Sequence, residues 1–216
     1  MTVPMEYANS YMPVKYFLAS YRALSDGRSG IHHLEQQLEA SAIAIPEWKI
    51  IWIGTCAVLR TAIALFQIDS KSCVAPCIRR EIAAEWAAII DHKEDHVIFW
   101  DFLKPERDSV IHHYRWQAYQ PWMRPDGTFR PANFSLLMLS NDDARPILLM
   151  ESGPFKGRNS IDLLKEGADW VEARIIGAIR RAGYDPDEYR GLVHFQPQPT
   201  PEGGGLLSDP GNSETK

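Results

Sequence analysis

The sequence lacks most of the short motifs that identify a protein class at once. Its 216 residues contain only three cysteines, and Cys73 and Cys77 are separated by three residues instead of the two that are typical of zinc knuckles. No second cysteine pair completes a set of metal ligands. A glycine-rich phosphate loop, a Gly-x-Ser-x-Gly elbow and a dinucleotide fingerprint are also absent, which disfavours P-loop nucleotide hydrolysis and serine hydrolase chemistry. We therefore predict no metal and no cofactor.

The sequence also has no large excess of positive charge and no apolar segment long enough to cross a membrane. The formal net charge is −5, so the protein as a whole has no basic field that attracts nucleic acid at long range. The longest uncharged apolar run, residues 50–59, ends at Arg60 and is shorter than the ~20 residues that a membrane span needs. The first six residues contain no basic segment leading into an apolar one. These absences predict a cytoplasmic protein without membrane contact.

Helical periodicity is the strongest feature that the sequence does have. Apolar residues at helical spacing predict short helices at 14–24 and 31–39, with a break between them at the glycine- and serine-containing residues 26–30. Longer helices are predicted at 47–68, the most apolar segment, and at 76–103. These four segments indicate a helical bundle.

Proline and polar residues mark the end of this helical region. Pro105 is expected to end or kink the preceding helix and to stand in the first turn of a new one, residues 105–118. Two apolar runs, 134–139 and 147–150, are separated by a stretch that contains the six polar or turn-forming residues 141–146. This pattern predicts a β-hairpin over about 134–151.

The last part of the chain predicts a closing helix and a tail. Asn159 or Ser160 is a suitable cap for a helix over about 160–182, and Gly183 is a suitable stop. Residues 195–216 are polar and rich in proline and glycine, which predicts a disordered tail. The predicted fold class is therefore mainly α, with the bundle, the C-terminal hairpin and the closing helix packed as one domain over residues 10–194.

The segment with the clearest chemistry lies at the start of the predicted helix 105–118. Arg107 stands in the first turn, where free backbone N–H groups and the helix dipole favour anions, and its guanidinium can hold a phosphate with two hydrogen bonds. Asp108 and His112 are four residues apart and therefore neighbours on the helix surface. A carboxylate beside an imidazole fixes its tautomer and stabilises its charged form. This pair is typical of a general acid or base near neutral pH.

The order of these residues resembles a known motif. Arg107, Asp108, three residues ending in two aliphatics, His112, one further residue and Tyr114 resemble the Arg-x4–6-His motif of the HEPN superfamily, the small helical domains of many prokaryotic toxins and defence ribonucleases. The resemblance covers roughly residues 45–118. It implies a HEPN-like bundle that cleaves RNA without a metal, at a cleft between two copies of the chain in a homodimer. A toxin–antitoxin setting would add an antitoxin or another protein as a partner.

The resemblance also implies roles for individual residues. Arg107 would bind and stabilise the scissile phosphate, and His112 would be the general acid or base acting on the ribose 2′-OH. Asp108 occupies the polar position beside the arginine, and Tyr114 matches the aromatic after the histidine. His113 matches no essential position and is either a second proton carrier or a bystander.

Aromatic and basic residues after the motif are candidates for substrate binding. Arg115, Trp122 and Arg124 belong to a proline-rich stretch in which arginines alternate with aromatics. Such a mixture stacks on single-stranded bases in many nucleic-acid-binding proteins. It serves equally well to pack a loop onto a domain.

Two other interpretations remain open at this point. A HEPN-like fold can be a non-catalytic binding protein, since fold does not determine function. In a third interpretation, His92 and His96, four residues apart in the predicted helix 76–103, chelate a transition metal together with His112 or His113. The competing interpretation of this histidine pair is a solvated helix face of mixed charge.

Overall fold

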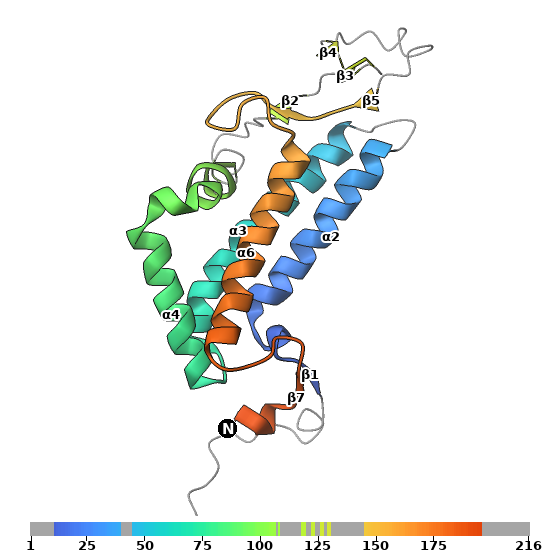
Figure 1. Ribbon diagram of the computed structural model, residues 1–216. Helices are drawn as coiled ribbons and strands as arrows, with labels where there is room; N and C mark the ends of the chain where they lie inside the picture. Colours follow the sequence, from blue (N-terminus) through green and yellow to red (C-terminus); the bar gives the residue numbers. More distant parts are fainter. Residues whose placement is uncertain are drawn as a thin grey trace, which may run out of the picture.

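The computed structural model describes residues 11–39, 45–106, 108, 118–119, 122–123, 126–127, 129–130 and 145–195. Four long helices build the body of the protein: α2 (Ala19–Glu39), α3 (Ile45–Ser72), α4 (Pro76–Asp91) and α6 (Ser160–Arg181). Helix α6 crosses in front of α3 and also packs against α2 and α4 (Figure 1). The mainly helical class and the closing helix that the sequence predicts are therefore confirmed.

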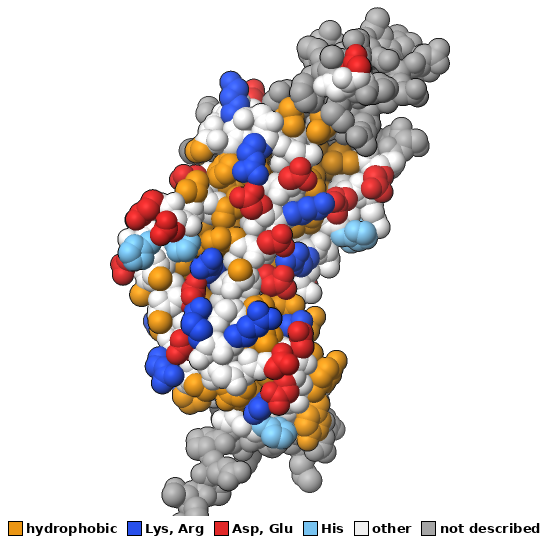
Figure 2. All heavy atoms as spheres, in the orientation of Figure 1, with side chains coloured by type: hydrophobic (Ala, Val, Ile, Leu, Met, Phe, Trp, Pro, Cys, Tyr) orange, Lys and Arg blue, Asp and Glu red, His pale blue; other side chains and the backbone are white. Residues whose placement is uncertain are grey.

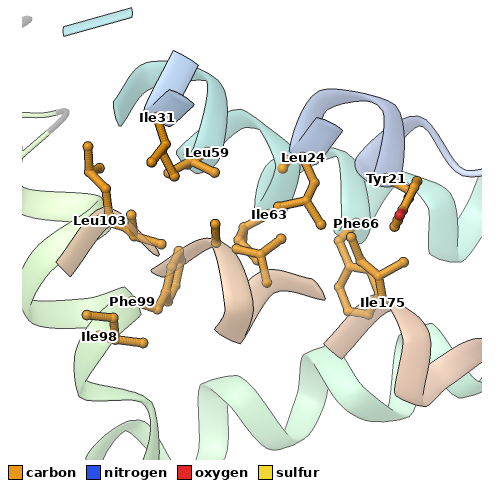
Figure 3. Close-up of a cluster of buried hydrophobic side chains, with 14 of the residues drawn as sticks. Tyr21, Leu24, Ile31, Leu59, Ile63, Phe66, Ile98, Phe99, Leu103 and Ile175 are labelled. Carbon is orange, nitrogen blue, oxygen red and sulfur yellow. The ribbon is translucent and has the colours of Figure 1, made fainter. Parts of the chain in front are cut away.

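The core lies between these four helices. Leu24, Ile63, Phe66 and Ile175 come from α2, α3 and α6 and point toward one another (Figure 3). Phe99, which follows α4 in the chain, extends the same cluster. The side chains are buried because each helix has its apolar residues on one face at a spacing of three or four.

Helix α3 is the central helix, as its apolar sequence predicts, but it is longer than expected. It runs over Ile45–Ser72 and has Pro46 in its first turn, where the missing N–H of proline costs nothing. Of the helices that the structure describes, only α3 is long and apolar enough to cross a membrane, yet just 39% of that apolar stretch is buried inside the protein. Core helices of globular proteins pass the same test, so this finding is weak evidence for a membrane protein.

Helix α2 corrects the predicted break at residues 26–30. The chain forms a short 3-10 helix, η1 (Val14–Phe17), and then one continuous helix through Gly27 and Gly30. Both glycines face α3, and a Cβ at Gly27 would lie 2.6 Å from Leu59 Cδ2. The helix continues because the close packing of α2 on α3 offsets the low helix propensity of glycine.

A buried carboxylate of α3 fixes the start of α2. Asp69 is 3% exposed and accepts hydrogen bonds from Ala19 N (3.2 Å), Ser20 N (2.9 Å) and Ser20 Oγ (2.7 Å). The first backbone N–H groups of a helix have no partner within the helix. Asp69 supplies that partner from a different helix, so the last turns of α3 are held against the first turn of α2.

The predicted helix 76–103 is interrupted. Helix α4 ends at Asp91, and the chain continues as a 3-10 helix, η2 (Lys93–His96), and a π-helix, η3 (Ile98–Leu103). Two contacts hold this bend: Phe99 stacks on Trp170 of α6 at 5.5 Å between ring centroids, and Trp100 Nε1 donates to the Ile89 carbonyl at 3.2 Å. The bend precedes Pro105, because burying these aromatic rings against α6 requires the chain to turn earlier.

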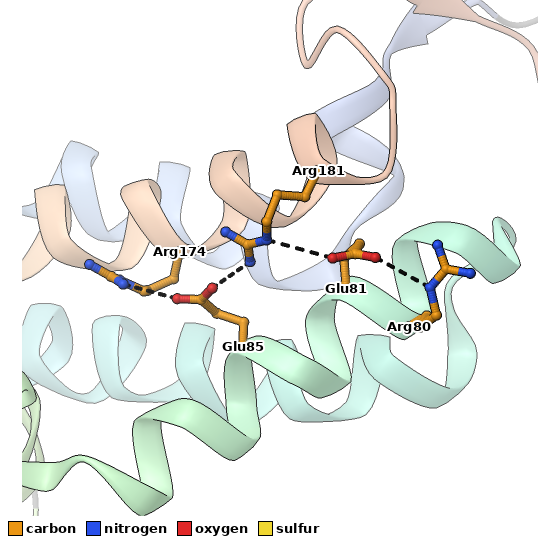
Figure 4. Close-up of polar contacts among 5 residues, drawn as sticks. All are labelled: Arg80, Glu81, Glu85, Arg174 and Arg181. Carbon is orange, nitrogen blue, oxygen red and sulfur yellow. Dashed lines mark hydrogen bonds and ion pairs between the residues drawn. The ribbon is translucent and has the colours of Figure 1, made fainter.

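Ion pairs connect α4 to α6 on the outside of the bundle. Glu85 of α4 lies between Arg174 and Arg181 of α6, with 2.9 Å between Arg174 Nη1 and Glu85 Oε1 (Figure 4). Arg181 also reaches Glu81, at 3.6 Å between Arg181 Nε and Glu81 Oε2. The position of α4 is therefore fixed by paired charges as well as by apolar contacts.

Helix α6 begins and ends where the sequence predicts. The Asn159 side chain accepts hydrogen bonds from Ile161 N (2.9 Å) and Asp162 N (3.4 Å). Gly183 has φ +87°, the left-handed conformation that commonly ends a helix. After the helix, β7 (Tyr189–Arg190) pairs with β1 (Met12–Pro13), and η5 (Leu192–Phe195) follows. The predicted tail starts at residue 195, but Phe195 is the last residue of η5 and is buried; residues 196–216 lie outside the described residues.

Short strands lie at the opposite end of the bundle from β1 and β7 (Figure 1). Strand β6 (Leu149–Met150) pairs with β2 (Ala118–Tyr119), and β3 (Trp122–Met123) pairs with both β4 (Phe129–Arg130) and β5 (Arg145–Pro146). Residues 134–139, the expected partner of 147–150, lie outside the described residues. The predicted helix 105–118 also cannot extend to its last residue, because Ala118 belongs to β2.

Candidate functional site

Most of the predicted site residues fall outside the part of the chain that the structure describes. This applies to Arg107, His112, His113, Tyr114, Arg115 and Arg124, while Trp122 is described only as backbone in β3. Asp108 is described and is half-buried in a helical turn. The structure therefore gives the surroundings in which the motif begins, residues 98–106, and these define the candidate site.

The segment that leads into the motif is held firmly against the core. Four residues of η3 are buried: Ile98, Phe99, Phe102 and Leu103. Leu103 packs on Gly167 of α6, where a Cβ would lie 3.0 Å from Leu103 Cδ2. Residues 104–106 continue in helical conformation directly from η3. The predicted helix end before Pro105 is wrong, because Lys104 keeps helical dihedral angles (φ −73°, ψ −51°). The helix predicted to start at residue 105 is helical at residues 105 and 106, and Arg107 lies outside the described residues.

Glu106, immediately before Arg107, is a buried carboxyl group. Its exposed fraction is 2%, and its Oε2 atom has no hydrogen-bond partner among the described residues. Trp52, on the inner face of α3, acts on Glu106, and Glu106 in turn acts on Cys56 of the same face. A buried carboxyl oxygen without a partner is unusual, because burying a charge without compensation is costly.

The apolar surroundings change the acidity of this group. Burial raises the pKa of Glu106 from an ordinary value of 4.5 to about 7, and the nearby indole N–H of Trp52 opposes this rise in part. Trp52 Nε1 is itself without a hydrogen-bond partner among the described residues, so its influence is that of a nearby donor and not of a formed bond. A carboxyl group with a pKa near 7 can gain or lose a proton at neutral pH.

Trp52, the ring that acts on Glu106, belongs to a chain of aromatic contacts. Trp48 and Trp52 are stacked at 5.3 Å between ring centroids, and Phe102 lies edge-on to Trp52 at 6.5 Å. Phe155, in the loop before α6, contacts Phe102 at 5.9 Å. Burial also raises the pKa of the Cys56 thiol, with a smaller contribution from the charge of Glu106, so Cys56 is not a reactive thiolate.

Sequence reasoning did not identify Glu106 as part of a site. A signal was nevertheless present, since Glu106 follows the buried Phe102 and Leu103 at helical spacings of four and three residues. A single acidic residue in an otherwise apolar helical stripe points into the core. Its partner cannot be deduced from the sequence, because Trp52 lies more than fifty residues away.

The two histidines of the metal interpretation lie in different surroundings. His92 follows the last residue of α4 and is exposed, whereas His96 is 7% exposed and packs edge-on against Trp170 at 5.6 Å. The change from α-helix to 3-10 helix between them removes the common helical face that the spacing predicts. Burial lowers the pKa of His96, with a further contribution from Arg174. No group of three metal-binding side chains occurs within the described ranges.

A shallow hollow lies far from Glu106, between the start of η1 and the outer side of α6. Its volume is about 350 Å³, and Lys15, Asp169, Glu172 and Asp187 line it. These charges are already engaged, since Lys15 pairs with Asp187 and Arg28 pairs with Asp169 and Glu172. Arg180 also lines the hollow and is the one lining cation with no ion pair among the described residues, so most but not all of the charge around the hollow is engaged.

The surface around α2 and α6 shows no patch of one sign. Lys and Arg side chains alternate with Asp and Glu side chains over this face (Figure 2). Comparison of the chain with protein-family models, with curated proteins and with solved structures found no match. Any function must therefore be argued from the residues themselves.

Proposed function

We propose that the protein is a metal-independent ribonuclease in which Arg107 and His112 carry the reaction. The proposal depends on one observation, the motif from Arg107 to Tyr114, which starts directly after the buried Glu106. The helices α3 and α4 that precede it contact each other, an arrangement compatible with a HEPN-like bundle. The burial of Glu106 against the inner face of α3 supports the proposal. It fixes the chain directly before Arg107, and a catalytic side chain must be held in a defined position.

The proposed chemistry uses the two side chains in different ways. His112 removes the proton from the ribose 2′-OH, the 2′-oxygen forms a bond to phosphorus, and the bond to the 5′-oxygen breaks. The proton ends on the departing 5′-oxygen. Arg107 stabilises the negative charge that builds up on the phosphate oxygens in the transition state. Asp108, next to Arg107 in the motif, orients the His112 imidazole.

The test is cleavage of RNA by purified protein in the presence of a metal chelator. Total cellular RNA is incubated with the wild type and with Arg107→Ala and His112→Ala, and new ends are mapped by sequencing. Loss of a general acid or base, or of a charge-stabilising group, is expected to lower the rate by about 100-fold or more. His33→Ala and Arg180→Ala are matched controls, because both side chains are exposed, on α2 and α6, and belong to neither the motif nor the surroundings of Glu106; they should cleave like the wild type.

Equal cleavage by the wild type and both motif variants would show that a contaminating nuclease is responsible and would refute the proposal. Circular dichroism checks that the variants keep their helical content. His113→Ala separates the two roles of this residue, since a second proton carrier reduces the rate and a bystander does not.

The net charge of −5 favours a second function, a non-catalytic binding module for another protein, because RNA-binding affinity depends on phosphate contacts with Lys and Arg. In this case no RNA is cut by the wild type. Affinity purification of the tagged protein should then recover one partner in stoichiometric amount, an antitoxin or another protein. Arg107→Ala would leave that complex intact if the motif has only a structural role.

A further inference from the structure

The two faces of α3 have very different surroundings. On the inner face, Trp52, Leu59 and Phe66 are fully buried. On the outer face, Ile50 is 69% exposed and Ile68 is 53% exposed. Between them, a Cβ added at Gly54 would meet nothing within 4 Å. The most apolar helix of the protein thus has one face without a partner in the described part of the chain.

Exposed and half-buried residues on the outer face follow a regular pattern, which we call the outer seam. Their separations alternate between three and four residues, the spacing that two helices use when they pack along their length. The outer seam consists of Glu47, Ile50, Gly54, Ala57, Thr61, Ala64, Ile68 and Lys71.

The outer seam is complementary to itself in the antiparallel direction. If two copies of α3 pair about a twofold axis near residue 59, Glu47 lies opposite Lys71 of the other copy and Ile50 lies opposite its Ile68. The small residues also match, because Gly54 then faces Ala64. In a parallel pair, by contrast, Glu47 would face Glu47 and Lys71 would face Lys71. Charge therefore selects the antiparallel arrangement.

We propose that the outer seam of α3 is the surface on which a second copy of this chain binds, antiparallel and about a twofold axis. Small residues in the middle allow two helix backbones to approach closely, which increases the dispersion contacts between them. A lipid surface gains affinity mainly from buried apolar area, and Gly54, Ala57 and Thr61 offer little of it. The observations therefore favour a second helix over a membrane.

The proposal does not depend on ribonuclease activity. Trp52 and Cys56, the residues of α3 on the Glu106 side, are each two residues from Gly54 and hence about 200° away around the helix. Pairing through the outer seam leaves the surroundings of Glu106 unchanged. Oligomeric state is measured without RNA, so a monomeric protein that cleaves RNA would refute this proposal alone.

Charge reversal with rescue is the sharpest test. Sedimentation velocity at low salt is expected to show a dimer for the wild type. Glu47→Lys and Lys71→Glu should each weaken it about tenfold, because each places two like-charged pairs in the dimer. The double variant should return to within about threefold of the wild type. Residues 47 and 71 are about 36 Å apart along one helix, farther than the ~10 Å reach of charges in salt, so rescue requires pairing between copies.

A bulky charge at the centre gives an independent measurement. Thr61→Arg is exposed in the monomer but stands next to the twofold axis in the dimer, so it should be monomeric with unchanged helical content. Ala84→Arg, at an exposed position of α4, is the matched control and should remain dimeric. A monomeric wild type, a dimeric Thr61→Arg variant or a failed rescue would overturn the proposal. Binding of the wild type to phosphatidylcholine vesicles, lost in Thr61→Arg, would assign the outer seam to lipid instead.

Discussion

Glycines of α2 pack against the inner face of α3, and one glycine of α3 lies on its outer face. The surroundings of these glycines differ. In α2, Gly27 and Gly30 face α3 so closely that a Cβ at Gly30 would overlap Thr55 Oγ1. In α3, Gly54 faces outward, where a Cβ would meet nothing within 4 Å. A glycine inside a helix costs about 0.5–1 kcal/mol relative to alanine. For Gly27 and Gly30 the close packing offsets this cost within one chain, while for Gly54 only a second copy would offset it.

Polar residues of α3 differ between the same two faces. Asp69 is buried and receives three hydrogen bonds from the start of α2, whereas Glu47 and Lys71 are exposed. Removing a buried acceptor is costly because it leaves its hydrogen-bond donors unsatisfied, whereas exposed charges contribute little to stability. The inner face therefore holds the single chain together, and the dimer that we propose would use the outer face.

The largest expected effect tests the inner face. Asp69→Ala leaves Ala19 N, Ser20 N and Ser20 Oγ without their acceptor, and Ser20 is fully buried. We expect a loss of about 4 kcal/mol in the free energy of unfolding, measured by urea denaturation. Lys71→Ala, two residues along but exposed, should change it by less than about 0.5 kcal/mol. Similar values for both variants would contradict the distinction between the two faces.

A somewhat smaller effect is expected from Glu106, and it depends on pH. Because its pKa is about 7 in the folded protein and 4.5 ordinarily, the folded state binds more protons between these values. The contribution of Glu106 to stability is therefore fully present below pH 4.5 and is lost as the pH rises through 7, by about 3 kcal/mol in total. Glu106→Gln should abolish this loss and make the protein more stable than the wild type at pH 8.

Thermal unfolding as a function of pH measures this effect. The control is Glu94→Gln, an exposed residue of η2, which should retain the pH dependence of the wild type. If Glu106→Gln also retains it, the carboxyl group is not the source.

The smallest changes in the free energy of unfolding are expected when glycines of α2 and α3 are replaced by alanine. Gly30→Ala is expected to destabilise the protein by about 2 kcal/mol, since the Cβ overlaps Thr55 and the helices must separate. Gly54→Ala, measured in the monomeric Thr61→Arg background, is expected to stabilise it by about 0.5–1 kcal/mol through helix propensity alone. Opposite signs for these two substitutions in urea denaturation would support the comparison, and a loss of stability at both positions would contradict it.

Local signals explain which elements could be predicted from the sequence. Helix α6 was predicted nearly to the residue, because Asn159 is an effective cap and Gly183 is an effective stop. The break in α2 was predicted wrongly because the reason for Gly27 and Gly30 lies in α3 and not in their neighbours. The bend after α4 was missed for the same reason, since its aromatic contacts are with α6.

Long-range pairing limits what could be predicted of the site. The strand partner of Leu149–Met150 is Ala118–Tyr119, and nothing in either sequence specifies the other. The spacing of His92 and His96 predicted a shared face that the end of α4 removes. The catalytic roles of Arg107 and His112 remain predictions from the motif. The burial of Glu106 just before them depends on its packing against α3, which the local sequence does not specify.

Strands β1 and β7 determine how the protein would respond to a mechanical load. They are antiparallel, with Met12 opposite Arg190. Residue 11, before β1, and residue 191, after β7, therefore adjoin the same end of the strand pair. Two further hydrogen bonds, from Val14 N to Glu188 O (3.0 Å) and from Lys15 N to Pro186 O (3.1 Å), continue toward the bundle. A force that pulls residues 11 and 191 apart would load these bonds one after another, as in opening a zipper. The molecule would therefore yield first at this end, while its four helices are still intact.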